Sequence, residues 1–178
     1  MKSVCISFLI VAIIILSVTG VYLNSDTPNC EYLRIHVRAD SNLEKDQAVK
    51  YKVKDAVVEY LTPFISECDT KKKAQTLLTS RLDEIERVAD KVLEENGFDY
   101  RCTANVRNEK FPTRVYGDLE LKSGFYDALI LELGSGHGDN WWCVVYPPLC
   151  FTGEGKNYVY RSKIKEIIDE FYKKKGEI

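Results

Sequence analysis

Several residues in the second half of the sequence carry side chains that could take part in chemistry. Residues 134–140 are Gly-Ser-Gly-His-Gly-Asp-Asn and so contain Ser135, His137 and Asp139. A Ser-His-Asp triad is defined by its geometry, and three near neighbours in sequence would need an unusual conformation to form one. The run also lacks the Gly-Lys-Ser or Gly-Lys-Thr ending of a phosphate-binding loop. We therefore interpret residues 134–140 as a flexible loop.

A cysteine hydrolase is the other chemistry that the residue types allow. Cys143 or Cys150 would be the nucleophile and His137 or His36 the base, and the chain has only two histidines. These histidines imply no third ligand, so we predict no metal site, and no motif indicates a cofactor. An exported hydrolase of the cell wall or of peptides, or a structural extracytoplasmic domain, is the alternative function.

The N-terminus indicates that the chain is exported. Residues 4–23 contain no charge and follow Lys2, an order that is typical of an export segment. The short side chains of Val18 and Gly20 would permit cleavage before Val21, whereas the length of the run would also allow an uncleaved anchor. We predict a signal peptide or membrane anchor at 1–23, which contacts the membrane, a tether at 24–31 and one folded domain at 32–178.

Export changes the interpretation of the cysteines. Five of them lie beyond the apolar segment: Cys30, Cys68, Cys102, Cys143 and Cys150. Cys143 and Cys150 flank Pro147 and Pro148, so a strand, a turn and a returning segment could bring their sulfur atoms together. In an oxidising compartment such a pair is expected to be bonded. We predict this disulfide, with two buried thiols as the alternative, and leave the pairing of the other three open.

The composition indicates one folded domain without a strong charge of either sign. The chain has 178 residues, of which 45% are hydrophobic, which suffices for one core. Its 25 basic and 27 acidic residues nearly cancel. Since no net field would attract a polyanion, we predict no nucleic-acid partner.

The hydrophobic periodicity predicts blocks of strand and helix along the chain. We expect strands at 32–38, 100–106, 125–133 and 141–146, an extended segment at 111–116, and helices at 43–64, 71–96 and near the C-terminus. In the first strand, apolar residues alternate with Arg34, His36 and Arg38, which predicts one buried face. Polar residues 40–42 are expected to cap the first helix. The predicted fold class is α+β: a single domain with a mostly antiparallel sheet, two long helices and a C-terminal helix.

Three stretches of the sequence resemble the stage II sporulation protein R family. The first comprises Leu33 to Ser41 and continues into 46–57, the second is Phe111 to Leu119, and the third is Asn140 to Phe151. The last two are long, unusual in composition and in the order of the family. His36 and Asp40 depart from the plainer residues of its pattern.

The resemblance implies a signalling role and no catalytic activity. Such proteins are made in the forespore and exported to the forespore membrane or the space between the two sporulation membranes. There they activate a membrane-embedded aspartic protease of the mother cell, which removes the pro-sequence of a sigma factor. We expect this chain to be the activator of that protease.

A contact surface for the protease is predicted from the second and third stretches. Arg114 has the planar donor fork that suits a carboxylate or backbone partner. Trp141 and Trp142 are adjacent in a strand and should face opposite sides, and an exposed tryptophan is a good interface anchor. A solvent-facing arginine and two core tryptophans are the structural alternatives. The predicted contact residues are Phe111, Pro112, Thr113, Arg114, Tyr116, Gly117, Trp141, Trp142, Pro147 and Pro148.

Overall fold

The computed structural model describes residues 31–116, 119–151 and 158–176. Its elements in chain order are β1 (Leu33–Arg38), α2 (Glu44–Ile65), α3 (Lys71–Ser80), α4 (Leu82–Glu95), β2 (Cys102–Phe111), β3 (Arg114–Tyr116), β4 (Leu119–Leu121), β5 (Gly124–Leu133), β6 (Asn140–Tyr146), the 3-10 helix η1 (Leu149–Phe151) and α5 (Tyr158–Gly176). The predicted segment 1–23, and all of the tether except Glu31, lie outside these residues.

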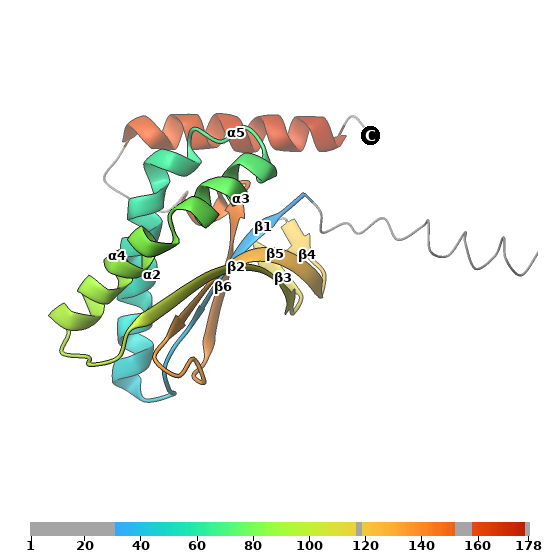
Figure 1. The fold of residues 1–178 in the computed structure, drawn as a ribbon. Helices are drawn as coiled ribbons and strands as arrows, with labels where there is room; N and C mark the ends of the chain where they lie inside the picture. The colour runs from blue at the N-terminus through green and yellow to red at the C-terminus, as the bar shows by residue number, and fades with distance from the viewer. Residues whose placement is uncertain (1–30, 117–118, 152–157, 177–178) are drawn as a thin grey trace, which may run out of the picture.

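A four-stranded sheet in the order β2-β5-β1-β6 forms the centre of the molecule. The β2–β5 and β1–β6 pairs are antiparallel, and β1 runs parallel to β5. The predicted α+β class with a mostly antiparallel sheet is therefore confirmed, with one parallel pair in a mixed sheet. The β3–β4 hairpin pairs only with itself and lies at the end of the sheet away from α4 (Figure 1).

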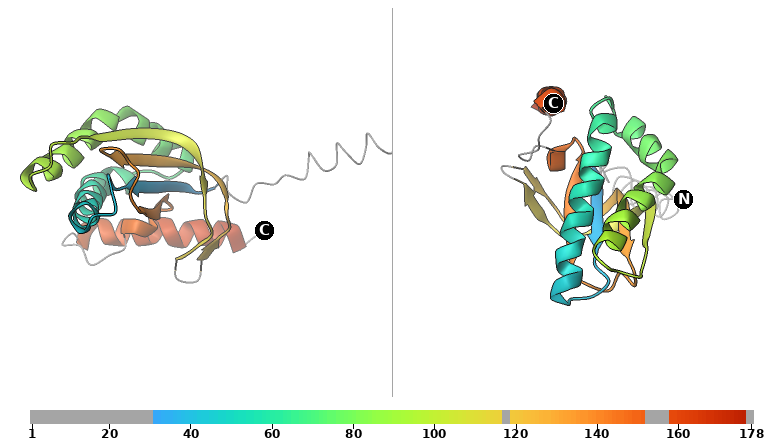
Figure 2. Two further views of the ribbon diagram at one scale, coloured as in Figure 1. Left: turned by 90° about the horizontal axis from the view of Figure 1, so that it is seen from below. Right: turned by 90° about the vertical axis from the view of Figure 1, so that its left-hand side faces the viewer.

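Helices α2, α3 and α4 cover one face of the sheet, which we call the helix face (Figures 1 and 2). Helix α2 buries a stripe of apolar side chains, and each contributes about 1.5–3 kcal/mol by leaving water. The stripe consists of Val49, Val53, Val57, Leu61 and Ile65. On the sheet, Leu33, Ile35 and Val37 of β1 belong to the same core.

The second predicted long helix is two helices that meet at Arg81. This residue has φ −121° and ψ 17°, outside the helical region. Its guanidinium lies 3.8 Å from the centre of the Phe64 ring and donates to Tyr60 Oη at 3.2 Å, which holds the bend against α2. Buried Leu78 and Ile85 continue one apolar pattern across the bend, so periodicity alone could not reveal it.

The first strand is buried on both faces, contrary to the predicted half-burial. Arg34 has no exposed surface and His36 is 4% exposed. Their side chains point to the face opposite the helices, where Tyr116 of the hairpin packs over the sheet. The alternation of apolar and polar residues correctly predicted a strand. The polar side of this strand is buried by the β3–β4 hairpin, which lies far away in the sequence.

Residues 134–139 form a loop, as predicted, and hydrogen bonds hold this loop against the corner between β1 and α2. Asp40 Oδ1 accepts from the Ser135 amide at 2.6 Å, and Asn42 Oδ1 accepts from the Asp139 amide at 2.6 Å. The buried Lys50 ammonium donates to Asp139 O at 3.0 Å. The predicted capping role of 40–42 is wrong, because α2 starts after Leu43 without a side-chain cap.

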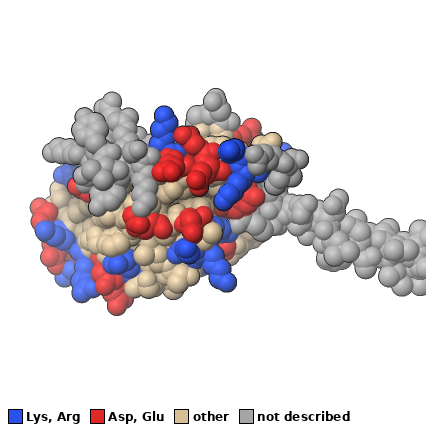
Figure 3. Space-filling view, turned by 90° about the horizontal axis from the view of Figure 1, so that it is seen from above, with Lys and Arg blue, Asp and Glu red and all other residues tan. Residues whose placement is uncertain are grey.

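Helix α5 lies across the C-terminal end of α2 (Figure 1). Phe171 attaches it, with ring centres 5.5 Å from Tyr32 and 6.3 Å from Tyr146. On the face seen from above in Figure 3, acidic and basic side chains are interleaved. None of the helices in the described part of the chain is both long and apolar enough to cross a membrane.

Candidate functional site

The candidate site is the sheet face opposite the helices, which we call the hairpin face. Strand alternation places Arg34, His36 and Arg38 of β1 on it, and the register of β6 puts Trp142 beside His36. The β3–β4 hairpin adds Tyr116 from the side. Charged and aromatic side chains from separate strands therefore meet on one surface.

Arg34 lies in a cage of aromatic rings at one end of the hairpin face. Its guanidinium carbon is 4.3 Å from the centre of the Phe111 ring, 4.8 Å from that of Tyr126 and 5.7 Å from that of Tyr116. Its Nη2 donates to Tyr116 Oη at 2.6 Å. A guanidinium over aromatic rings is attracted by their negative faces, so the cage suits a cation.

His36 occupies the middle of the hairpin face. Its ring stacks on Trp142 at 5.3 Å between centres and meets the edge of Phe111 at 5.7 Å. Nδ1 is 2.8 Å from Glu109 Oε1, and Nε2 is 2.8 Å from Asn140 Oδ1. Burial lowers the pKa of His36 below its ordinary value, although both hydrogen bonds oppose the shift. Both neighbouring atoms are acceptors and a neutral ring has only one N–H to donate, so the two hydrogen bonds together favour the charged ring.

Two acids and two arginines form an ion-pair network beside His36. Arg38 donates to Glu109 at 2.7 Å and to Glu132 at 2.6 Å, and Arg107 contacts both carboxylates at 3.0 Å. Burial by itself raises the pKa of Glu109, but hydrogen bonds from His36 and Arg107 hold it below its ordinary value. Glu109 is thus ionised at neutral pH and shared by three donors.

Arg114 and Trp142 form the accessible part of this site. The guanidinium carbon of Arg114 is 4.2 Å from the centre of the Trp142 ring, and both residues are half-buried. Trp141 faces the opposite side and packs on the helix-face core, with the Lys54 ammonium 5.4 Å from its ring. The predicted opposite orientation of the two tryptophans is confirmed.

The other predicted contact residues differ in exposure. Phe111 is 1% exposed and belongs to the core beneath this face, and Pro147 and Pro148 are buried, so none of the three is accessible to a partner. Pro112 and Thr113 are exposed beside Arg114. Tyr116 is half-buried over Arg34. Gly117 lies outside the described residues.

Cys143 and Cys150 lie against each other as free thiols. A hydrogen bond from Cys150 lowers the pKa of Cys143, and burial raises the pKa of Cys150. Cys150 Sγ also donates to Val144 O at 2.6 Å. The two sulfur atoms lie close together, as predicted. A disulfide between them stays a prediction.

The parts of the alternative cysteine hydrolase lie apart. His137 is exposed, Cys143 belongs to the helix-face core, and His36 lies on the hairpin face. Within the part of the chain that the structure describes, no hydrogen bond joins a histidine to a cysteine. The same residues contain no cluster of three or more His, Cys, Asp or Glu side chains that could hold a metal ion.

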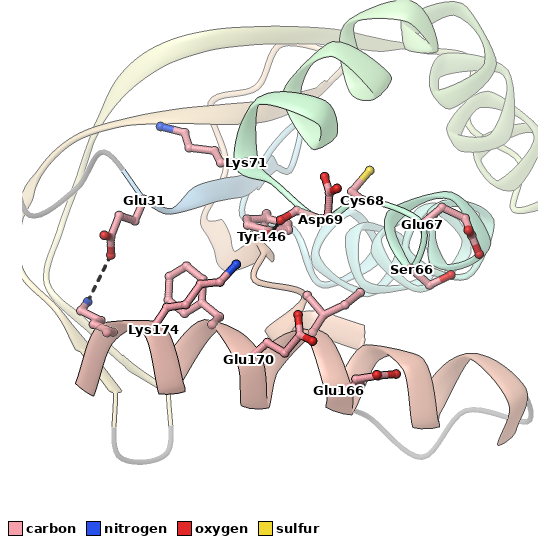
Figure 4. A pocket seen from close by; sticks show the side chains of 13 residues that line it. Glu31, Ser66, Glu67, Cys68, Asp69, Lys71, Tyr146, Glu166, Glu170 and Lys174 are labelled. Carbon is pink, nitrogen blue, oxygen red and sulfur yellow. Dashed lines mark hydrogen bonds and ion pairs between the residues drawn. The ribbon is translucent and has the colours of Figure 1, made fainter. Parts of the chain in front are cut away.

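A groove of about 460 Å³ lies between α5 and the corner that joins α2 to α3 (Figure 4). Glu67, Asp69, Glu170 and Lys174 line it, so charges of both signs face it. Burial raises the pKa of the Cys68 thiol at its edge, which makes this thiol a poor nucleophile. The groove offers no activated group, and we place the functional site on the hairpin face.

Arg34 and Glu109 are the site residues that sequence reasoning did not single out, and His36 was considered only as the base of the alternative cysteine hydrolase. The strand that holds Arg34 was predicted, but an alternating polar residue is normally solvated, and nothing local shows that Tyr116, 82 residues later, covers it. Glu109 lies beyond the predicted strand at 100–106. For Arg34 the available signal was the resemblance itself, since this residue lies within its first stretch.

Comparison with known proteins gives one family. A sequence model described as stage II sporulation protein R matches residues 29–156, which include every residue of the hairpin face named above. A protein with that name from Bacillus subtilis (strain 168) is 34% identical over 119 residues. This match covers 67% of the chain and 53% of the relative, so the chain spans about half the relative's length. No solved structure matches.

Proposed function

The chain belongs to the stage II sporulation protein R family, and from this premise we propose that it is an exported activator of a membrane-embedded aspartic protease. The protease would be the one that processes the precursor of the mother-cell sigma factor. The activator would act from the forespore membrane or from the space between the two sporulation membranes. Residues 1–23 would carry it there as a signal peptide or membrane anchor.

The proposed contact with the protease is the accessible part of the hairpin face. The observation that supports it is the stacking of Arg114 on Trp142, with Pro112 and Thr113 exposed alongside. A tryptophan and an arginine that are already packed together lose little side-chain freedom on binding, and both residue types are frequent binding hot spots. His36 stacks on Trp142, and Phe111 in turn packs against His36.

Activation requires more than tight binding. A ligand shifts an equilibrium only when it binds one state better than the other. Moving a protease from 1% to 99% active requires preferential binding of about 10⁴-fold. We therefore propose that the hairpin face recognises a surface that the protease presents only in its active, dimeric state.

Reconstitution in a non-sporulating host tests the function. The chain, the membrane protease and a tagged sigma-factor precursor are co-expressed, and the size of the precursor is followed with and without residues 1–23. We expect processing only when the exported chain is present. Absence of processing with all three proteins folded would contradict the proposal.

Variants of the hydrolase residues separate an activator from an enzyme. His137→Ala, and Cys143→Ser combined with Cys150→Ser, should leave processing intact in chains that remain folded. Loss of processing in folded His137→Ala would instead support the exported hydrolase, because His137 is an exposed side chain.

A further inference from the structure

Arg34 is a fully buried cation whose donors are only partly satisfied. The residue has no exposed surface, and its Nη2 donates to Tyr116 Oη at 2.6 Å. Its Nε and Nη1 atoms are buried without a hydrogen-bond partner among the described residues. Buried charges in proteins are normally paired and hydrogen-bonded, so this arrangement is costly as it stands.

Among the residues that the structure describes, no carboxylate forms an ion pair with Arg34. Burial raises the pKa of Tyr116 and of Tyr126, so both phenols stay neutral at pH 7. Glu109, on the same face, is engaged by His36, Arg38 and Arg107. The rings of the cage attract the cation, and the hydroxyl of Tyr116 accepts from Nη2, but Nε and Nη1 have no acceptor among the described residues.

The cover over Arg34 can move without breaking the main sheet. Tyr116 is in β3, and the backbone ladder of β3 joins it to β4 alone. Lifting Tyr116 would break one hydrogen bond to Arg34 and leave every strand pair of the main sheet intact. Nη2 would then be free, and each edge of the guanidinium would present two parallel N–H donors.

We propose that Arg34 is the receptor for a carboxylate of the partner protein, which replaces Tyr116 when the hairpin lifts. Two parallel N–H donors match the two oxygens of a carboxylate, and the aromatic walls would strengthen the ion pair by excluding water. This inference rests on the proposed function and names the chemistry that the partner brings. It also makes binding and hairpin movement one event.

Paired substitutions test the carboxylate receptor in the reconstituted system. Arg34→Met removes the charge at similar length, Arg34→Lys keeps a charge without the planar fork, and Arg101→Met makes the same change at an arginine whose side chain is 63% exposed. We expect folded Arg34→Met and Arg34→Lys to lower processing at least tenfold, and Arg101→Met to process normally. Arg34→Met should unfold at or above the wild-type temperature, since it removes an unpaired buried charge. Normal processing by folded Arg34→Met would overturn the proposal.

A binding measurement on the wild-type chain does not depend on the folding of Arg34 variants. Thermal unfolding is followed in sodium acetate and in sodium chloride at equal ionic strength, for the wild type and for Tyr116→Phe. We expect acetate to raise the unfolding temperature above that in chloride, because a ligand of the folded state stabilises it. The rise in unfolding temperature should be larger in Tyr116→Phe, because this variant lacks the hydroxyl that accepts from Arg34 Nη2.

The outcomes of the two experiments are distinct. No difference between acetate and chloride in either protein would overturn the receptor, and an equal shift in phosphate would overturn its preference for carboxylate. If the wild-type chain fails to trigger processing while acetate still stabilises it, the proposed function fails and the receptor stands.

Discussion

Replacing Gly138 by alanine tests whether the 134–139 segment is held against the β1–α2 corner. A Cβ atom at position 138 would lie 2.4 Å from Ser41 O, 2.6 Å from Ser41 C and 2.9 Å from the Cβ of Ala39. The first two are backbone atoms, so no side-chain rotation relieves the contact. The Gly138 amide also donates to Ala39 O at 2.8 Å, which fixes the segment at this point.

The expected cost follows from the size of the overlap. Overpacking a well-packed site typically destabilises by about 1–3 kcal/mol, and contact with rigid backbone places Gly138→Ala near the upper value. For a domain of this size, each kcal/mol lowers the unfolding temperature by about 2–4 °C. We therefore expect Gly138→Ala to unfold roughly 5–10 °C below the wild type.

Thermal unfolding of Gly138→Ala and Gly176→Ala measures this difference. Gly176→Ala is the matched control, because a Cβ there meets nothing within 4 Å, and its unfolding temperature should stay within about 1 °C of the wild type. A flexible loop, as the sequence alone suggested, would tolerate alanine at 138. Equal unfolding temperatures for Gly138→Ala and the wild type would refute the claim that residues 134–139 are held against the β1–α2 corner.

Two further predictions concern pH and redox state. Burial lowers the folded-state pKa of His36, so its contribution to stability is complete above pH 6.5 and is lost as pH falls toward the lowered pKa. Urea unfolding at pH 7.5 and 5.5 should show that acid destabilises the wild type more than His36→Gln; an equal loss in both would contradict this. Oxidised glutathione should bond Cys143 to Cys150, which stabilises the domain by about 2–3 kcal/mol over the reduced chain. Mass spectrometry after thiol alkylation measures the bond, and two alkylated thiols would refute it.

Local patterns predicted the elements because their causes are local. Alternation of apolar and polar residues located β1, and the Pro147-Pro148 pair marked the end of β6. Exact boundaries followed less well: β2 extends to Phe111, beyond the predicted 100–106, because it pairs along its whole length with β5. Strand length here is set by the partner strand, which the segment's own residues do not specify.

The candidate site could be predicted only in part. The sequence indicated Arg114 and Trp142 as candidates, but not that they stack on each other. Arg34 and His36 were assigned to a solvated face because burial of that face depends on a hairpin beyond residue 113. Glu109 was missed because its three donors come from β1 and from its own strand, and only the sheet register brings them together.

Processing of the sigma-factor precursor by surface variants tests the central claim most directly. Arg114→Ala and Trp142→Ala each remove one half of the stacked pair, and Arg101→Ala removes an exposed arginine outside the hairpin face. With all three chains folded and exported, we predict that the first two abolish processing and that Arg101→Ala processes at the wild-type level. Wild-type processing by both Arg114→Ala and Trp142→Ala would contradict activation through the hairpin face.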